Sequence, residues 1–282
     1  MGRTLFSPDI TTLKLHTGKE ILEITSLQKP SWASGIGRDK YGLFADFEIQ
    51  GIIQRFRWLE PGSFMMGSPE GEPERRDNET LHKVTLTKGF WLADSTVTQE
   101  LWQLVMGENP SEFKGKKRPV ETVRWEDAQE FIEKLNKLVP ELSVRLPSEA
   151  EWEYGCRAGT TTPFSFGDTI TPEQVNYDGQ VPYNKGEKGK FREQTVEVKS
   201  LPCNDWGLYE MHGNVWEWCQ DWFQPDLGRS PVTDPCGSEG VSRVLRGGSW
   251  ICLGGIVRSA FRDGYHPGFR SVGIGFRLAR GH

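Results

Sequence analysis

Residues 145–153, Arg-Leu-Pro-Ser-Glu-Ala-Glu-Trp-Glu, are the most informative stretch of the sequence and predict a strand-to-helix turn. Ser148 suits the N-cap of a helix, and Glu151 stands three residues later, where it completes a capping box. Pro147 lies near the helix start, and acidic residues suit the positive N-terminal end of a helix. This segment therefore predicts a helix that opens after Ser148 and closes at Gly159.

Two further helices are predicted upstream of this turn. Residues 98–106 carry apolar side chains at helical spacing and stop at Gly107, and residues 125–138 carry a longer apolar face. Between residues 44 and 59 the apolar residues alternate with polar ones, which predicts two strands joined near Gln50-Gly51. No long helix is indicated after residue 159, so the last ~120 residues are expected to form loops and short strands.

The composition is that of a folded, acidic protein. Hydrophobic residues make up 36% and charged residues 26%, and the formal net charge is -5. This charge argues against nucleic acid as a partner, because phosphate binding relies on clustered Lys and Arg. No apolar run approaches the ~20 residues of a membrane span, and residues 1–6 lack the pattern of a signal peptide. Five cysteines do not indicate a disulfide framework.

We expect the chain to divide near residue 44. Residues 1–44 are interpreted as an extension in which apolar and polar residues alternate about a turn at residues 16–19, which predicts a hairpin. Because no low-complexity linker follows, we expect this hairpin to pack on the main body. Residues 45–282 are expected to form the main domain.

Seven short motifs resemble the sulfatase-modifying-factor family, the domain of the formylglycine-generating enzyme. In chain order they are Gly62–Ser68, Val97–Gln99, Arg145–Glu153, Gly207–Met211, Gly213–Trp218, Arg246–Trp250 and Gly275–Arg277. The resemblance implies an α+β, C-type-lectin-like fold, with two to three helices around small antiparallel sheets and long irregular loops. We interpret the motifs themselves as scaffold, with Trp216 and Trp218 filling the core.

The resemblance does not extend to the residues that carry the family's oxidation chemistry. In formylglycine-generating enzymes two cysteines after the Gly-Gly-Ser motif bind copper; the first falls at Cys252 here and the second at Val257. One thiolate does not replace a site built from two sulfurs. The five histidines also lack the close spacing of a shared metal site on one helix. We therefore predict no enzymatic activity and no required cofactor.

An alternative stays open: a copper- or thiol-dependent oxidoreductase in which Cys252 works alone or with Cys219. The resemblance also implies a structural calcium ion, since family members often bind one through asparagine, carboxylate and backbone oxygens. The matching residues are Asn176, Asn214 and Glu217. Glu217 could instead accept hydrogen bonds from the turn beside it.

The sequence changes character after Trp250. Lys, Glu, Gln, Met and Trp together account for 68 of the 282 residues, so about six are expected in the 25 residues 251–275, and there are none. Codons ending in a pyrimidine cannot encode any of these five amino acids. A window made by randomising the adenines of asparagine codons would lack all five.

This pattern resembles the variable proteins of diversity-generating retroelements, particularly the Treponema type, whose relatives are surface-displayed lipoproteins. We call residues 251–273 the window. The resemblance implies that its diversified, ligand-binding positions are Ile251, Cys252, Leu253, Ile256, Phe261, Asp263, Gly264, Tyr265, His266, Phe269, Ser271, Val272 and Gly273. Gly254, Gly255, Val257 and Gly268 remain open. Arg258, Arg262 and Arg270 are expected to brace the loops through hydrogen bonds.

The window therefore predicts a non-catalytic binding protein. Large, rigid side chains such as Phe261, Tyr265 and Phe269 suit recognition of a protein ligand. For Phe261, Phe269 and Ile256 the alternative is an ordinary core position. We expect a monomer on the cell surface, anchored to the outer membrane by a lipid that this chain does not encode. A constant structural subunit remains a further alternative, and it predicts a window that does not vary between lineages.

Overall fold

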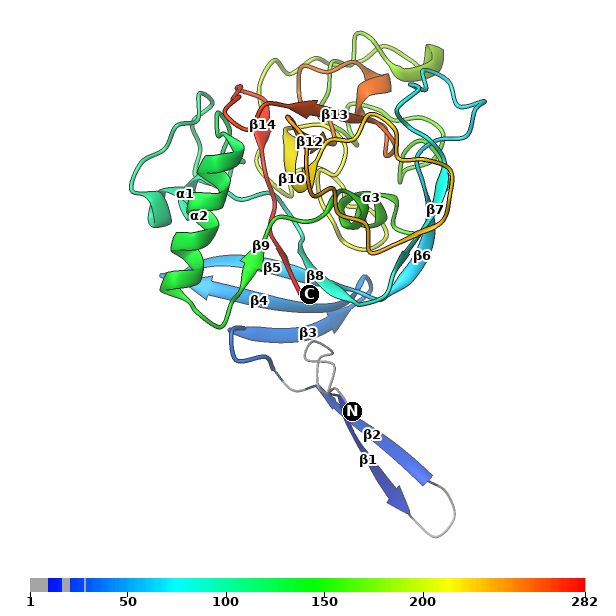
Figure 1. The fold of residues 1–282 in the computed structure, drawn as a ribbon. Coiled ribbons are helices and arrows are strands. Elements are labelled where there is room, and N and C mark those ends of the chain that lie inside the picture. The colour runs from blue at the N-terminus through cyan, green and yellow to red at the C-terminus, as the bar shows by residue number, and fades with distance from the viewer. Residues whose placement is uncertain (1–9, 17–20, 28, 282) are drawn as a thin grey trace.

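The computed structural model describes residues 10–16, 21–27 and 29–281, with side chains from residue 29 onward. Figure 1 shows α-helices among many short strands and long loops. The helices are α1 (Gln99–Met106), α2 (Trp125–Leu138) and α3 (Glu149–Arg157), with the short 3-10 helices η1 (Tyr183–Lys185) and η2 (Gly254–Val257). The strands are β1 (Ile10–His16), β2 (Ile21–Leu27), β3 (Gly35–Asp39), β4 (Gly42–Ile49), β5 (Ile52–Leu59), β6 (Gly62–Met66), β7 (His82–Leu86), β8 (Phe90–Ala93), β9 (Val144–Arg145), β10 (Trp216–Trp222), β11 (Val232–Thr233), β12 (Arg243–Arg246), β13 (Arg262–Tyr265), β14 (Ile274–Gly275) and β15 (Ala279–Arg280).

The three predicted helices are confirmed, because their boundaries depend on local caps. In α3 the Ser148 hydroxyl accepts a hydrogen bond from the Glu151 amide at 3.1 Å, and the Glu151 carboxylate accepts one from the Ser148 amide at 2.8 Å. The helix ends at Ala158, one residue before the expected Gly159, in a left-handed conformation. Thr98 caps α1, and Gly107 ends it with a φ of 86°.

The described strands form four sheets, and most of their strand pairs are antiparallel. The largest sheet has the order β3-β4-β5-β8-β15-β9, and a second has the order β13-β12-β10-β14. The predicted turn between β4 and β5 is confirmed at Gln50 and Gly51, both of which have positive φ. Strand β15, near the C-terminus, lies between β8 and β9 and so joins β9 to the rest of the large sheet (Figure 1).

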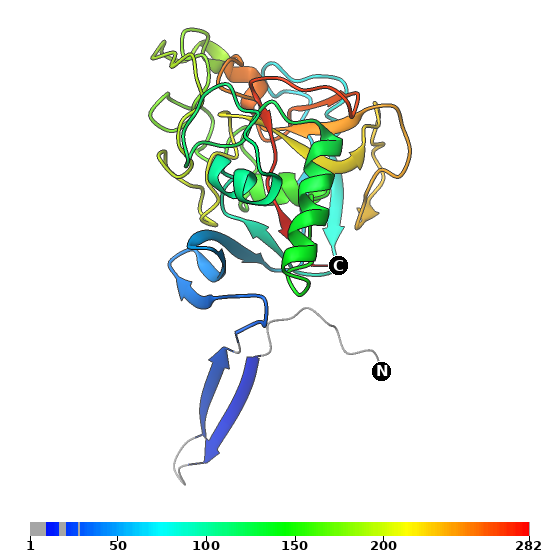
Figure 2. The same cartoon turned by 90° about the vertical axis from the view of Figure 1, so that its left-hand side faces the viewer.

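The main hydrophobic core lies between the large sheet and the pair α1 and α2, which lie side by side in both views (Figures 1 and 2). Trp102 of α1 stacks on Phe131 of α2 with ring centroids 5.3 Å apart, and Phe276 meets both rings edge-on. Trp218 is fully buried, as predicted. This α+β arrangement agrees with the fold class inferred from the sequence.

The predicted hairpin appears as the antiparallel pair β1 and β2. Its turn at residues 17–20 and the side chains of both strands lie outside the described residues, and so does the expected packing of the hairpin on the body. Trp32 and Ala33 belong to the main core, and residue 44 falls inside β4. No described helix combines the length and apolarity that crossing a membrane needs.

Candidate binding face at residues 251–273

Buried arginines hold the backbone of the window in place. Arg258 has no exposed surface and donates to Glu79 at 2.7 and 2.8 Å and to Glu72 at 2.5 Å. Its Nε also donates to the Gly255 carbonyl at 2.9 Å. Burial alone would lower the pKa of Arg258, but the two carboxylates outweigh it and hold that pKa above its usual value. Arg258 therefore ties the window to the distant segment 72–79.

Two more buried arginines anchor the middle of the window. Arg246 pairs with Glu153 and donates to the carbonyls of Ser259 at 2.8 Å and Phe261 at 2.6 Å. Arg262 makes a two-pronged ion pair with Glu149 at 2.6 and 2.7 Å. Burial acts to raise the pKa of Glu149, yet Arg262 and Arg246 prevail and that pKa lies below its usual value.

We call Arg246, Arg258 and Arg262 the arginine frame. The bracing role predicted for Arg258 and Arg262 is confirmed. Arg270 differs, because it is exposed and its side chain bonds to no other described residue.

The structure sorts the thirteen predicted contact positions into three groups. Six are exposed, and we call them the window face: Ile251, Leu253, Tyr265, His266, Phe269 and Val272. Five are half-buried: Cys252, Ile256, Asp263, Gly264 and Ser271. Two are buried: Phe261 and Gly273. Of the positions left open, Gly268 is exposed, whereas Gly254, Gly255 and Val257 are buried.

Phe261 and Gly273 depart from the expectation that they offer contact area. Phe261 is 2% exposed and packs against Trp216, with ring centroids 5.8 Å apart. A Cβ added to Gly273 would lie 2.9 Å from the Ser249 hydroxyl, so a side chain there requires Ser249 to move. Both residues are buried and therefore support the window from beneath.

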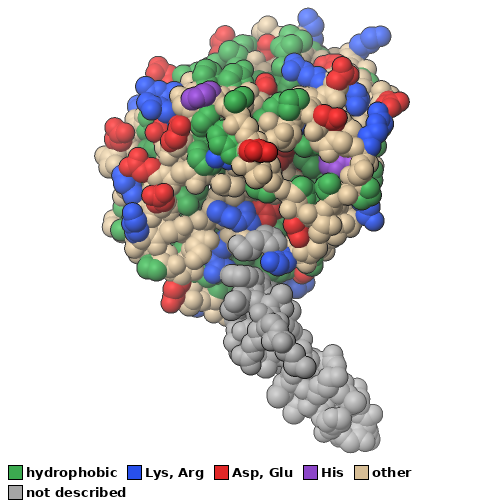
Figure 3. Space-filling model, in the orientation of Figure 1, with side chains coloured by type: hydrophobic (Ala, Val, Ile, Leu, Met, Phe, Trp, Pro, Cys, Tyr) green, Lys and Arg blue, Asp and Glu red, His purple; other side chains and the backbone are tan. Residues whose placement is uncertain are grey.

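Most of the exposed positions are apolar, and two of them contact each other. Tyr265 and Phe269 are 40% and 41% exposed and stack on each other with centroids 4.6 Å apart. The Trp250 indole donates to the Val272 carbonyl at 3.2 Å, which ties Val272 to the scaffold. In the space-filling view, hydrophobic side chains gather on the upper part of the molecule, over the region of β12–β14 (Figure 3).

The positions of three scaffold residues next to this surface were not predicted from the sequence. Val181 is 45% exposed, and its carbonyl accepts a hydrogen bond from Gly254. Trp216, predicted as core, is only partly buried and lies against Phe261. The Arg76 guanidinium lies over the Phe261 ring at 4.5 Å. No local pattern marks these residues, because they reach the window only through tertiary folding.

Cys252 and Val257 stand where the resemblance to formylglycine-generating enzymes places the two copper-binding cysteines. Burial raises the pKa of the Cys252 thiol, and its contact with Ser249 at 3.4 Å offsets this only in part. Val257 is fully buried and packs so tightly on Gly248 that an added Cβ there would lie 2.6 Å from its Cγ1. Cys219 is buried, and burial raises the pKa of its thiol well above its usual value. In the part of the chain that the structure describes, no three His, Cys, Asp or Glu side chains are grouped as a metal site.

The three residues considered for calcium fit it unequally. Asn176 and Asn214 lie together, with Nδ2 of Asn176 3.1 Å from Oδ1 of Asn214. Oδ1 of Asn176 is buried without a hydrogen-bond partner among the described residues, which suits a cation ligand. Glu217 does not fit, because Arg277 binds both of its oxygens at 2.5 and 2.6 Å and Trp152 donates to it at 2.8 Å. The guanidinium already supplies the positive charge that a metal would bring.

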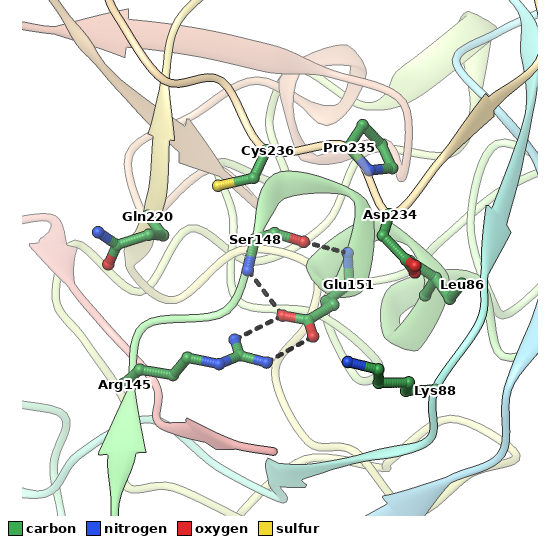
Figure 4. Close-up of a pocket in the computed structure, with 9 residues that line it drawn as sticks. All are labelled: Leu86, Lys88, Arg145, Ser148, Glu151, Gln220, Asp234, Pro235 and Cys236. Atoms are coloured by element: carbon green, nitrogen blue, oxygen red, sulfur yellow. Dashed lines mark hydrogen bonds and ion pairs between the residues drawn. The ribbon is translucent and has the colours of Figure 1, made fainter. Parts of the chain in front are cut away.

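A separate cleft of about 350 Å³ lies at the start of α3 and is shown in Figure 4. Its lining consists of Leu86, Lys88, Arg145, Ser148, Glu151, Gln220, Asp234, Pro235 and Cys236. Arg145 and Glu151 face each other there and form a two-pronged ion pair at 2.6 and 2.7 Å. Asp234 accepts hydrogen bonds from Thr87, and burial raises the pKa of Cys236 to about 12. These groups stabilise the loops of the cleft and include no activated nucleophile.

The fold and the window face define a scaffold domain that presents an apolar surface built from irregular chain. Residues 45–282 match the family described as the sulfatase-modifying factor enzyme 1-like domain, and the chain belongs to this family. It is 40% identical over 172 residues to a formylglycine-generating enzyme of Streptomyces coelicolor, a match covering 57% of this chain and 52% of that protein. It is 32% identical over 263 residues to the serine/threonine-protein kinase pkn1 of Chlamydia caviae, covering 82% of this chain and 39% of the kinase. The chain thus spans about half the length of these relatives or less.

Two solved structures share the fold. Treponema denticola variable protein 1 superposes with a TM-score of 0.73 at 30% identity, covering 84% of this chain and 98% of its own. PvdO from Pseudomonas aeruginosa superposes with a TM-score of 0.71 at 27% identity, covering 89% and 99% of the two chains. The relatives therefore include both proteins named as enzymes and a protein named as variable.

Proposed function

We propose that this chain is a non-catalytic, receptor- or adhesin-like protein whose window is diversified by a retroelement and binds a protein ligand. One observation carries the proposal. Of the ten large hydrophobic side chains that are exposed among the described residues, five lie in the window: Ile251, Leu253, Tyr265, Phe269 and Val272. Apolar side chains concentrated on one surface mark an interaction site. The absence of Lys, Glu, Gln, Met and Trp from residues 251–275 is the composition that randomised asparagine codons would produce, which supports diversification by a retroelement.

The architecture supports variation of the window without loss of the fold. The arginine frame holds the window through side chains that lie beneath its exposed positions, so substitutions on the window face leave those ion pairs in place. The similarity to Treponema denticola variable protein 1 supports the same proposal. We further propose that the protein acts as a monomer and is displayed at the cell surface.

The competing candidate is an oxidoreductase of the formylglycine-generating type, favoured by the identity to the Streptomyces coelicolor enzyme. Against it stand the apolar Val257 at the second cysteine position and a Cys252 thiol whose pKa burial has raised, since the thiolate is the metal ligand and the nucleophile. Incubation with copper and a cysteine-containing sulfatase-like peptide tests it directly. Turnover that depends on Cys252 would overturn the binding-only proposal.

The principal test is to sequence the gene in many clonal descendants of one strain. Differences clustered in the window, arising where a template carries adenine and sparing Trp250 and residues 275–277, support the proposal. An invariant window contradicts it. Against a protein ligand selected on this chain, replacing Tyr265 and Phe269 with Ala should weaken binding by about 2 kcal/mol or more and leave the melting temperature unchanged. Ile53→Ala, which truncates an exposed apolar side chain at the β4–β5 hairpin, outside the window, is the control.

A further inference from the structure

One exposed apolar side chain outside the window lies directly beside it. Val181 is 45% exposed and belongs to the loop that precedes η1, far from the window in sequence. Its carbonyl accepts a hydrogen bond from the Gly254 amide at 3.0 Å, and the Asp178 amide donates to the Cys252 carbonyl at 2.9 Å. These two bonds hold the two segments side by side, so Val181 borders the window.

The two segments lead into short helices that are neighbours. Helix η1 follows Val181 and η2 begins at Gly254, and both lie together near the top of the molecule in the two views (Figures 1 and 2). A Cβ added to Gly254 would lie only 2.3 Å from the Tyr183 backbone nitrogen. Tyr183 is itself buried, and its hydroxyl donates to the Pro73 carbonyl at 3.1 Å. The chain that carries Val181 is therefore fixed against both the window and the scaffold.

Local hydrogen bonds also fix the turn that carries Val181. The Asp178 carboxylate accepts a hydrogen bond from the Gln180 amide at 3.0 Å, and the Asp178 carbonyl accepts one from the Val181 amide at 3.1 Å. Valine is branched at Cβ, which restricts its side-chain torsion. Because the backbone and the side chain are already ordered, a ligand that packs on Val181 loses little conformational entropy there.

Val181 differs from the other exposed hydrophobic side chains of the scaffold. Outside the window the described residues expose five large ones: Ile53, Met65, Leu138, Val181 and Val241. Of these five, Val181 is the one whose backbone is hydrogen-bonded to a window residue. Single exposed apolar residues are common on protein surfaces, whereas Val181 adds to a group of them at the start of the window, where Ile251 and Leu253 lie.

We propose that Val181 is a constant contact of the binding face, on which an aliphatic or aromatic side chain of the protein ligand packs whichever residues the window carries. This inference rests on the proposed binding function. Contacts made by window residues change from one variant to the next, so a contact common to all variants has to come from the scaffold. The occupant is apolar because Val181 and the neighbouring Leu253 offer no side-chain group that would compensate a buried charge.

The test uses a phage-displayed library of a small three-helix protein with one randomised face, selected on the immobilised full chain. A second panel is selected on a chain with an altered window, Ile251→Thr/Tyr265→Asn/Phe269→Leu, whose substitutions lie at exposed positions. Binders that also recognise Ile251→Ala/Tyr265→Ala/Phe269→Ala are removed first from both panels. The retained binders therefore depend on the window.

We expect substitutions of Val181 to weaken both panels, as measured by biolayer interferometry. Val181→Ala should weaken binding about threefold, because part of a valine's burial is lost. Val181→Asp should weaken it at least about tenfold, because a carboxylate is then buried without a partner. Val241→Asp is the matched control and should change neither panel, since it places the same charge on a valine that is 82% exposed outside the window. All three variants should melt within about 2 °C of the parent, as for other surface substitutions.

The other outcomes separate this inference from the binding function. Retained binders that tolerate Val181→Asp, or that lose affinity on one window only, would overturn the constant contact and leave the binding function standing. If no binder survives the removal step, the result counts against the binding function itself. A parent chain that is dimeric in light scattering, and monomeric as Val181→Asp, would identify a second copy of the chain as the occupant and refute the ligand contact.

Discussion

Removal of the Arg258 guanidinium should destabilise the domain strongly. In Arg258→Met, the Glu79 and Glu72 carboxylates remain buried without the cation that pairs with both. Removing one partner of a buried ion pair costs about 3–5 kcal/mol, because the remaining charge has lost both water and its counter-charge. With a stability of about 5–15 kcal/mol for a typical domain, this loss lowers the melting temperature by about 10 °C.

Urea denaturation followed by tryptophan fluorescence measures the change, and two control variants show its origin. The triple variant Arg258→Met/Glu72→Gln/Glu79→Gln removes the orphaned charges and should recover part of the stability. Arg229→Met removes an exposed pair and should stay within about 0.5 kcal/mol of the parent. An Arg258→Met protein as stable as Arg229→Met would refute the claim that this ion-pair cluster holds the window.

Three further predictions concern variation, pH and calcium. Among clonal variants, positions 254, 255 and 257 should stay constant and position 268 should vary, which amplicon sequencing measures. A Cβ added at position 254 would lie 2.3 Å from the Tyr183 backbone nitrogen, whereas a Cβ added at position 268 would meet only a flexible side chain. Burial raises the pKa of Glu210 to about 8, so its contribution to stability is fully present below the unfolded-state pKa of 4.5 and is lost as the pH rises through 8. The unfolding free energy of the parent should therefore fall relative to Glu210→Gln between pH 5 and 8, and parallel slopes in urea titrations would contradict the assignment. EDTA should leave the melting temperature unchanged, since Arg277 neutralises Glu217; a lowered value restored by calcium would show that Asn176 holds the ion.

Local chemistry made parts of the fold predictable. Helices α1 and α3 each begin at a capping side chain and end at a residue in the left-handed conformation, and both signals are local. Helix α2 follows from the helical spacing of its apolar residues. The β4–β5 turn is equally local. Sheet order was not predictable, because β15 joins β8 and β9 across more than 130 residues of intervening chain.

The candidate site, like the fold, was predictable from the sequence only in part. Missing residue types marked the window, but they could not distinguish exposed Phe269 from buried Phe261, since both are apolar and neither lies in a periodic element. The contribution of Arg76 was hidden for a different reason: its segment is separated from the window by most of the domain.

The sequence alone indicated the family and the helices, and it alone predicts where the window lies, because motifs, caps, periodicity and codon-dependent composition are properties of neighbouring residues. Tertiary structure alone decided which window residues face solvent and which arginines hold them. The physical reason is that burial and charge neutralisation depend on what the rest of the chain brings to each side chain. Glu217 shows this plainly: as a sequence position it suits a calcium ligand, and in the fold Arg277 takes both of its oxygens.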